Sequence, residues 1–202
     1  MREISARAGV SPGLIRHHFG NKDALRAECD AEVLRRYRDL KVEGIRMSPT
    51  QTMATLSQLD DFAPMFVYIL RSVRDGGDAG REFVEGMIAE AEAFSEDAVR
   101  EGVLKPSRDP AARARYLVTS SLGGLLVQLT LMPDLDLGDM GQAIHRLTES
   151  IMLPTLELFT EGVLADPSVL DEYLAQSPGP PAAPDDQPSP PSRLQTEREE
   201  ND

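Results

Sequence analysis

Apolar residues recur along the chain at spacings of three and four, the period that places them on one side of an α-helix. No run of Val, Ile, Thr and aromatic residues alternates with a period of two, as a half-buried strand would. The sequence therefore predicts an all-α fold. The longest stripe predicts one helix over 22–46, with Arg26, Arg35, Arg36 and Lys41 largely off its apolar face. That face carries Leu25, Cys29, Val33, Tyr37, Leu40 and Ile45.

Capping residues followed by Pro mark the starts of further helices, because Pro lacks the N–H that the first helical residue leaves unpaired. Such pairs are Ser11-Pro12, Ser48-Pro49, Asp109-Pro110 and Asp166-Pro167. Between them the pattern predicts a short helix over 50–59, an apolar helix over 62–74 and an acidic amphipathic helix over 79–102. The run Asp75-Gly76-Gly77-Asp78 is expected to separate the last two.

Two strongly apolar helices are predicted over 110–132 and 139–164. Their apolar residues spread around more than one face, and a helix of this kind has to be covered on several sides. We therefore expect one face in the protein's own core and another against a second copy of the chain, as a homodimer. Pro154 removes one backbone hydrogen bond and should kink the second helix.

The composition of the 202 residues, 41% of them hydrophobic, supports one larger folded domain with a smaller one. Three regions are expected: a DNA-binding region with its connecting helix at 1–46, a regulatory and dimerisation domain at 47–176, and a tail at 177–202. Seven of the 26 tail residues are Pro, which predicts a disordered, acidic segment. A single cysteine, no signal peptide and no apolar run of about 18 residues predict a cytoplasmic protein that makes no membrane contact.

The net charge of −13 argues against a nucleic-acid partner only when the chain is taken as a whole. Residues 1–46 hold 10 Lys and Arg against 7 Asp and Glu, a net charge of +3, so the remainder carries −16. Positive charge is concentrated at the N-terminal end, where contact with phosphate would be made.

The first 22 residues have the pattern of a helix-turn-helix. Ile4 and Ala8 share one face of a short helix, and Gly9 has the backbone freedom to end it. Ser11 is a good N-cap for a second helix that starts almost at once. Such a tight turn leaves the second helix exposed for the major groove of DNA.

The positions Ala8-Gly9-Val10-Ser11, Gly13, Ile15, His18-Phe19, Asn21-Lys22 and Leu25 together resemble the signature of the TetR family of bacterial transcriptional regulators. The resemblance covers about 25 residues. It implies a homodimer that binds double-stranded operator DNA, usually as a repressor, and an all-helical body that binds a small-molecule effector. Residues 110–132 and 139–164 resemble the helices through which the family dimerises.

The resemblance assigns DNA contacts to the second helix and to the residue that begins the third. Lys22 is expected at a phosphate, and Arg16 and His17 at base edges or phosphates. Arg16 departs from the family, which commonly has Tyr there, so base preference is expected to differ. His18 is either a DNA contact or a structural side chain. The expected DNA-binding residues are Ser11, Gly13, Leu14, Arg16, His17, His18 and Lys22.

Members of the family begin with an additional helix, and residue 1 falls where their second helix starts. From the sequence we therefore expect the first helix to be missing, which leaves Ile4, Ala8, Ile15 and Phe19 without one wall of their core. The alternative function is a truncated dimeric relative that does not bind DNA and instead binds ligand or pairs with an intact homologue.

Other site chemistry is sparse. No nucleophile stands beside a positioned base, so we expect no enzyme activity and no cofactor. Adjacent histidines should point apart on a helix, and His17, His18, Cys29 and His145 lack metal-ligand spacing, so no metal site is expected. A pocket for the effector is expected among aromatic, flexible and polar side chains. The candidates are Phe62, Phe66, Ile69, Met87, Phe94, Tyr116, Ser120 and Gln128.

Overall fold

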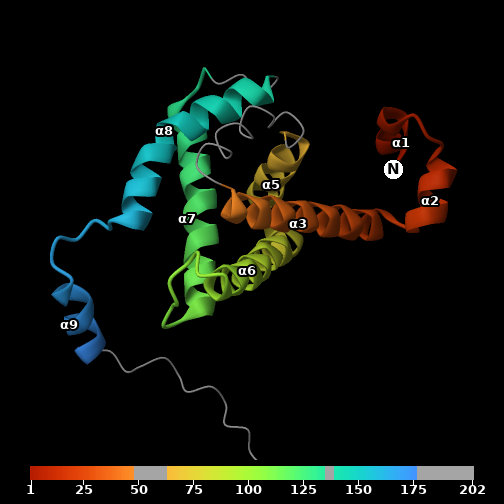
Figure 1. The fold of residues 1–202 in the computed structure, drawn as a ribbon. Helices are drawn as coiled ribbons and strands as arrows, with labels where there is room; N and C mark the ends of the chain where they lie inside the picture. Colours follow the sequence, from red (N-terminus) through yellow and green to blue (C-terminus); the bar gives the residue numbers. More distant parts are fainter. Residues whose placement is uncertain (48–62, 135–138, 177–202) are drawn as a thin grey trace, which may run out of the picture. The chain divides into compact units, whose positions relative to one another are not determined.

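A computed structural model describes residues 1–47, 63–134 and 139–176, and these residues form eight α-helices and no strand. The prediction of an all-α fold is confirmed. Seven helices belong to a first unit that ends at Glu161, and α9 (Ser168–Gln176) belongs to a second unit. The seven are α1 (Arg2–Ala8), α2 (Pro12–Phe19), α3 (Lys22–Arg46), α5 (Ala63–Asp75), α6 (Gly77–Arg100), α7 (Pro110–Leu131) and α8 (Met140–Thr160) (Figure 1).

Helix α6 lies at the centre of the first unit, because it contacts α3, α5 and α7. Phe83 of α6 is only 2% exposed, and burying a side chain of this size contributes about 1.5–3 kcal/mol. The alternation of large and small side chains lets the helices approach closely. The buried cluster consists of Val33, Met65, Ile69, Phe83, Met87, Ile88, Ala91, Ala114 and Val118.

The caps read from the sequence are present wherever the structure describes them. The Ser11 hydroxyl accepts a hydrogen bond from the Leu14 amide at 3.1 Å, and Asp109 Oδ1 accepts one from the Ala112 amide at 2.9 Å. Asp166 Oδ1 accepts the Ser168 amide at the start of α9, and the resulting hydrogen bonds hold the pKa of Asp166 below its ordinary value. The predicted cap at Ser48-Pro49, the helix over 50–59 and the tail over 177–202 lie outside the described residues.

Several helix ends differ from the prediction. Helix α6 starts at Gly77 rather than at residue 79, because Gly76 and Gly77 complete the turn after α5 with positive φ values of 60° and 67°. Helix α8 ends at Thr160 rather than at residue 164, and Gly162 follows with a φ of 83°. Pro154 lies inside α8, and Figure 1 shows that this helix bends along its length.

Candidate functional site

The connection between α1 and α2 is a tight turn built from local interactions. Gly9 adopts the left-handed conformation, with φ 67° and ψ 24°, and the Val10 amide donates to the Ser5 carbonyl at 3.0 Å. Ser5 is buried and its hydroxyl donates to the Arg2 carbonyl at 2.8 Å. The backbone groups at the end of α1 are therefore satisfied within the turn itself, which fixes the direction in which α2 leaves.

Helix α2 has one buried side chain, Ile15, and otherwise faces solvent. Ile15 is 6% exposed, whereas the neighbouring Leu14 is 45% exposed. An ideal Cβ on Gly13 would meet only the Ser11 hydroxyl, at 3.8 Å, so no protein atom crowds this position. The remaining residues expected at DNA are exposed as well: Ser11, Gly13, Arg16, His17, His18 and Lys22.

The two histidines lie closer together than expected from the sequence. The rings of His17 and His18 meet edge to face, with centroids 5.5 Å apart. Adjacent helical positions start 100° apart, but the long imidazole side chains of an exposed last turn can lean together. No group of three or more His, Cys, Asp and Glu side chains that could hold a metal ion occurs among the described residues.

Lys22 is the first residue of α3, directly after its N-cap. Asn21 Oδ1 accepts a hydrogen bond from the Ala24 amide at 2.8 Å, so the cap orients the start of the helix. The first amides of α3 and the Lys22 ammonium both present positive charge at this end. This is a favourable arrangement for an anionic group such as a phosphate.

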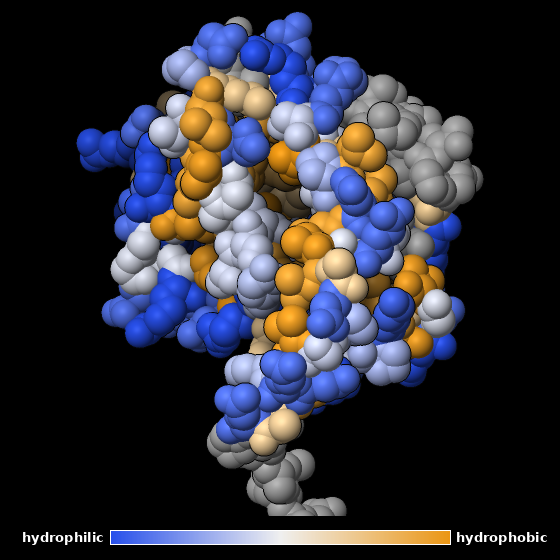
Figure 2. All heavy atoms as spheres, turned by 90° about the vertical axis from the view of Figure 1, so that its left-hand side faces the viewer, coloured by the Kyte–Doolittle hydropathy of each residue, from blue (hydrophilic) through white to orange (hydrophobic). Residues whose placement is uncertain are grey.

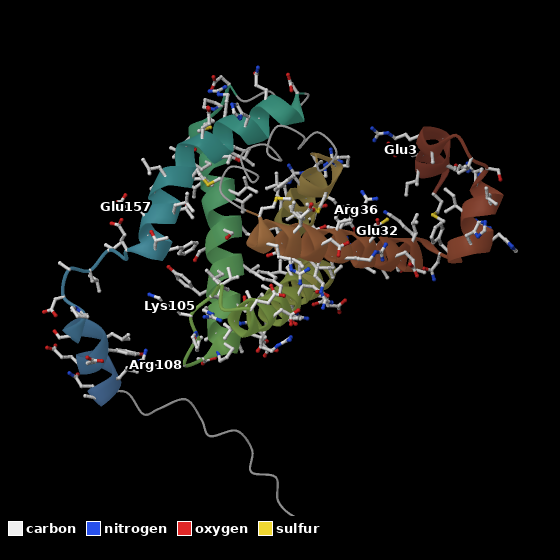
Figure 3. The ribbon with its side chains drawn as sticks, viewed as in Figure 1. Glu3, Glu32, Arg36, Lys105, Arg108 and Glu157 are labelled. Atoms are coloured by element: carbon white, nitrogen blue, oxygen red, sulfur yellow. The ribbon has the colours of Figure 1, made fainter. Side chains whose placement is uncertain are left out.

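Ion pairing divides the cations of residues 1–46 into two groups. Within the described residues, no carboxylate pairs with Arg2, Arg7, Arg16 or Lys22. The arginines further along α3 are all paired, for example Arg36 Nε with Glu32 Oε1 at 2.6 Å (Figure 3). The unpaired cations of the helix-turn-helix thus lie on α1 (Arg2 and Arg7), on α2 (Arg16) and at the start of α3 (Lys22), and Lys41 further along α3 is also without a carboxylate partner in the described residues.

A second candidate site is a cavity of about 370 Å³ lined by α3, α5, α6, α7 and α8. Of the seventeen described residues that line it, thirteen are aliphatic, Met or Phe. The four others are Tyr37, Lys41, Ser121 and Thr148. Burial raises the pKa of Tyr37 to about 12, so its hydroxyl stays neutral at physiological pH. An apolar cavity with a few polar groups is typical of a small-molecule site.

The structure brings together part of the set expected at the effector pocket. Phe66, Ile69 and Met87 line the cavity. Four others do not line it: Phe94, whose ring packs against Tyr37 with centroids 6.5 Å apart, and Tyr116, Ser120 and Gln128 of α7. Phe62 lies outside the described residues. The polar residues that do line the cavity were not expected from the sequence, and Lys41 is the most consequential of them.

An exposed helix-turn-helix, joined by one long helix to a helical body with an apolar cavity, defines the class of helix-turn-helix transcriptional regulators. Residues 1–29 match the family described as bacterial regulatory proteins, tetR family, and residues 60–165 match the tetracyclin repressor-like, C-terminal domain. The chain belongs to the TetR family of transcriptional regulators, as the sequence resemblance indicated.

One relative covers most of the chain. The HTH-type transcriptional regulatory protein RaaS of Mycobacterium tuberculosis (strain ATCC 25618 / H37Rv) is 36% identical over 178 residues, which are 88% of this chain and 83% of the relative. A match of this length includes the helical body. Among the described residues, no helix has the length and apolar character needed to cross a bilayer.

Proposed function

We propose that this regulator binds operator DNA through α2 and represses the adjoining promoter. The observation that carries the proposal is the set of unpaired cations, Arg16 and Lys22 among them, beside the paired arginines of α3. Lys22 contacts a phosphate, while Arg16 and His17 reach base edges or phosphates. The rest of the surface comprises Ser11, Gly13, Leu14 and His18. In this proposal residues 1–46 bind DNA, and residues 47–176 regulate and dimerise.

The DNA-binding form is a homodimer that pairs through 110–132 and 139–164. Both helices expose large apolar side chains, among them Val127 at 57%, Leu131 at 68% and Leu153 at 74%. Figure 2 shows several hydrophobic patches on one face of the molecule, with polar side chains between them. Exposed apolar side chains of this size favour burial against a second copy. Two recognition helices related by a twofold axis then reach successive major grooves, about 34–36 Å apart.

Effector binding in the cavity releases the DNA. The cavity is lined both by α3, which leads to α2, and by α8, which lies in the proposed dimer interface. A ligand that binds more tightly to one spacing of these helices increases the population of the conformation that has this spacing. The effector therefore acts by moving the two recognition helices away from the spacing of the operator.

The test is a fluorescence-anisotropy titration with duplex DNA from the promoter of the protein's own gene, at several salt concentrations. Lys22→Ala and Arg16→Ala are each expected to weaken binding, and Lys22→Ala to reduce the slope of log K against log salt by about 1.8, or 0.9 per subunit. Arg36→Ala is the matched control, because it removes the same charge from a residue already paired with Glu32. A reporter gene under the same promoter then reports repression.

The outcomes separate the proposal from its alternative. A dimer with no salt-dependent affinity for this DNA would establish a regulator that acts without direct DNA binding. Equal losses in Arg16→Ala and Arg36→Ala would overturn the assignment of α2 as the recognition helix. If the protein increases transcription from the promoter, the proposal of repression is overturned, whereas the proposal of operator binding through α2 stands.

A further inference from the structure

Lys41 is an exception among the cations of α3. After Lys22, this helix carries five arginines and Lys41, and each of the arginines forms an ion pair in the described part of the chain. Two of these pairs reach beyond α3, from Arg38 to Glu90 of α6 at 3.4 Å and from Arg46 to Glu101, the C-cap residue of α6, at 2.8 Å. Within the described residues no carboxylate pairs with Lys41.

Lys41 lies at the cavity rather than among these ion pairs. Its Nζ lies 5.6 Å from the centroid of the Tyr37 ring, and both residues line the cavity. Among the described residues, the other polar side chains that line it are those of Ser121 and Thr148, which carry no charge. Within this part of the chain, Lys41 therefore supplies the one formal charge of the lining, which is positive, beside thirteen apolar residues.

Lys41 is solvent-exposed, so its ammonium is open to the head group of a ligand whose body lies in the cavity. The apolar side chains on its other side lower the pKa of Lys41 from its ordinary value by desolvation. An anionic head group at this position would accept a charge-assisted hydrogen bond from the ammonium. Tyr37, whose hydroxyl stays protonated, is a second possible donor beside it.

We infer that the effector is an amphipathic organic acid, with an apolar body in the cavity and one carboxylate paired with Lys41. This inference rests on the proposal that the cavity is the effector site, and it adds the chemical class. The cavity of about 370 Å³ lies near the lower end of the range of about 300–1,000 Å³ for small-molecule sites, which suits one chain of medium length. The thirteen apolar lining residues hold the chain, and Lys41 sets the sign of its head group.

The experiment compares three probes with the same ten-carbon tail: decanoate, decanol and decylammonium. Binding to the full-length protein is measured by isothermal titration calorimetry below the concentrations at which the probes form micelles. Decanoate is expected to bind at least tenfold more tightly than the other two. Lys41→Met should reduce its affinity at least tenfold and leave decanol unchanged, whereas Lys41→Arg should retain the preference for the acid.

Lys105→Met is the matched control. It removes the same charge from an exposed residue in the connection between α6 and α7 (Figure 3), outside the cavity lining. Lys41→Glu reverses the charge at this position. This variant should bind decylammonium more tightly than decanoate. Circular dichroism melts identify any variant that fails to fold. If Lys41→Met or Lys41→Glu does not fold, the probe affinities of Lys41→Arg are compared with those of the wild type instead.

Each result decides one statement. Equal affinities for decanoate and decanol, or an unchanged preference in Lys41→Met, would overturn the anionic class but leave the cavity as the effector site. Absence of binding by all three probes would overturn the inference. DNA affinity, measured separately on the same samples with the Arg16→Ala control, shows whether the proposed DNA-binding function fails with it or stands alone.

Discussion

The hydroxyl of Tyr68 donates a hydrogen bond to Oδ1 of Asp30 at 2.6 Å, across 38 positions of sequence. It joins α5 of the body to α3, the helix that begins at Lys22. The Tyr68 ring also meets Phe83 of α6 edge to face, with centroids 5.8 Å apart. On the other side, Asp30 Oδ2 lies 3.7 Å from Nε of Arg26. One part-buried polar contact therefore fixes the first half of α3 to the core.

Removal of this contact should lower stability. Tyr68→Phe keeps the ring and leaves the Asp30 carboxylate without its donor, and hydrogen bonds to charged groups contribute about 1.5–3 kcal/mol. A decrease of that size is expected in the free energy of unfolding, measured with urea. Tyr116→Phe is the control, because Tyr116 is 68% exposed and its change should stay within about 0.5 kcal/mol. Equal effects of the two substitutions would exclude a special role for the Tyr68 hydroxyl.

The half-buried Tyr37 predicts a loss of stability in alkali. Its pKa is near 10 in the unfolded chain and is raised by burial to about 12 in the folded protein. Its contribution is thus complete below pH 10 and is lost as the pH rises from 10 toward 12, at up to about 1.4 kcal/mol per pH unit. Tyr37→Phe should flatten this part of the dependence in urea unfolding between pH 8 and 11. A parallel dependence in wild type and variant would contradict it.

The turn chemistry of the helix-turn-helix could be predicted from the sequence because it is local. Gly9 and Ser11 act on atoms within a few residues, so their identities alone indicate a left-handed turn and a cap. The composition of the cavity depends instead on which helices meet. Phe94 and Tyr116 have the aromatic character of pocket residues, yet one packs against Tyr37 and the other faces solvent.

Lys41 was placed largely off the apolar stripe of its helix, and no periodicity assigns it to a cavity formed by other helices. One signal was available in the sequence. Lys41 has Tyr37 and Arg38 before it and Gly44 and Ile45 after it at helical spacings of three and four, so no acid can pair with it along the helix. Arg36, by contrast, has Glu32 four residues before it. A cation without such a partner is a candidate for a contact with something else.

Helices α5 and α6 approach so closely at Gly80 that any larger residue there should destabilise the fold. An ideal Cβ on Gly80 would lie 2.8 Å from the backbone carbonyl oxygen of Ser72, which cannot rotate away. Gly80→Ala should therefore destabilise the protein by about 1–3 kcal/mol. Gly44→Ala is the matched control within α3, where no atom of the described residues lies within 4 Å of the added Cβ, and a gain of about 0.5–1 kcal/mol is expected. Thermal unfolding of the two variants should shift in opposite directions.

The proposed dimer predicts that one charge on α8 prevents pairing. Leu153 is 74% exposed in the single chain, so Leu153→Glu should leave the fold of the subunit intact. In a twofold interface the substitution occurs twice, and each buried carboxylate would lack a partner. The dissociation constant should rise at least a hundredfold, equivalent to about 2.7 kcal/mol.

Sedimentation equilibrium measures this directly, with wild type expected at twice 22.2 kDa and Leu153→Glu at 22.2 kDa. The variant should also lose operator affinity, because a single recognition helix contacts only one half-site. Val103→Glu introduces the same charge at a residue 51% exposed between α6 and α7, and it should remain a dimer. If Leu153→Glu stays dimeric with unchanged DNA affinity, residue 153 does not lie in the interface, and the exposed apolar face of α8 has to be covered in some other way.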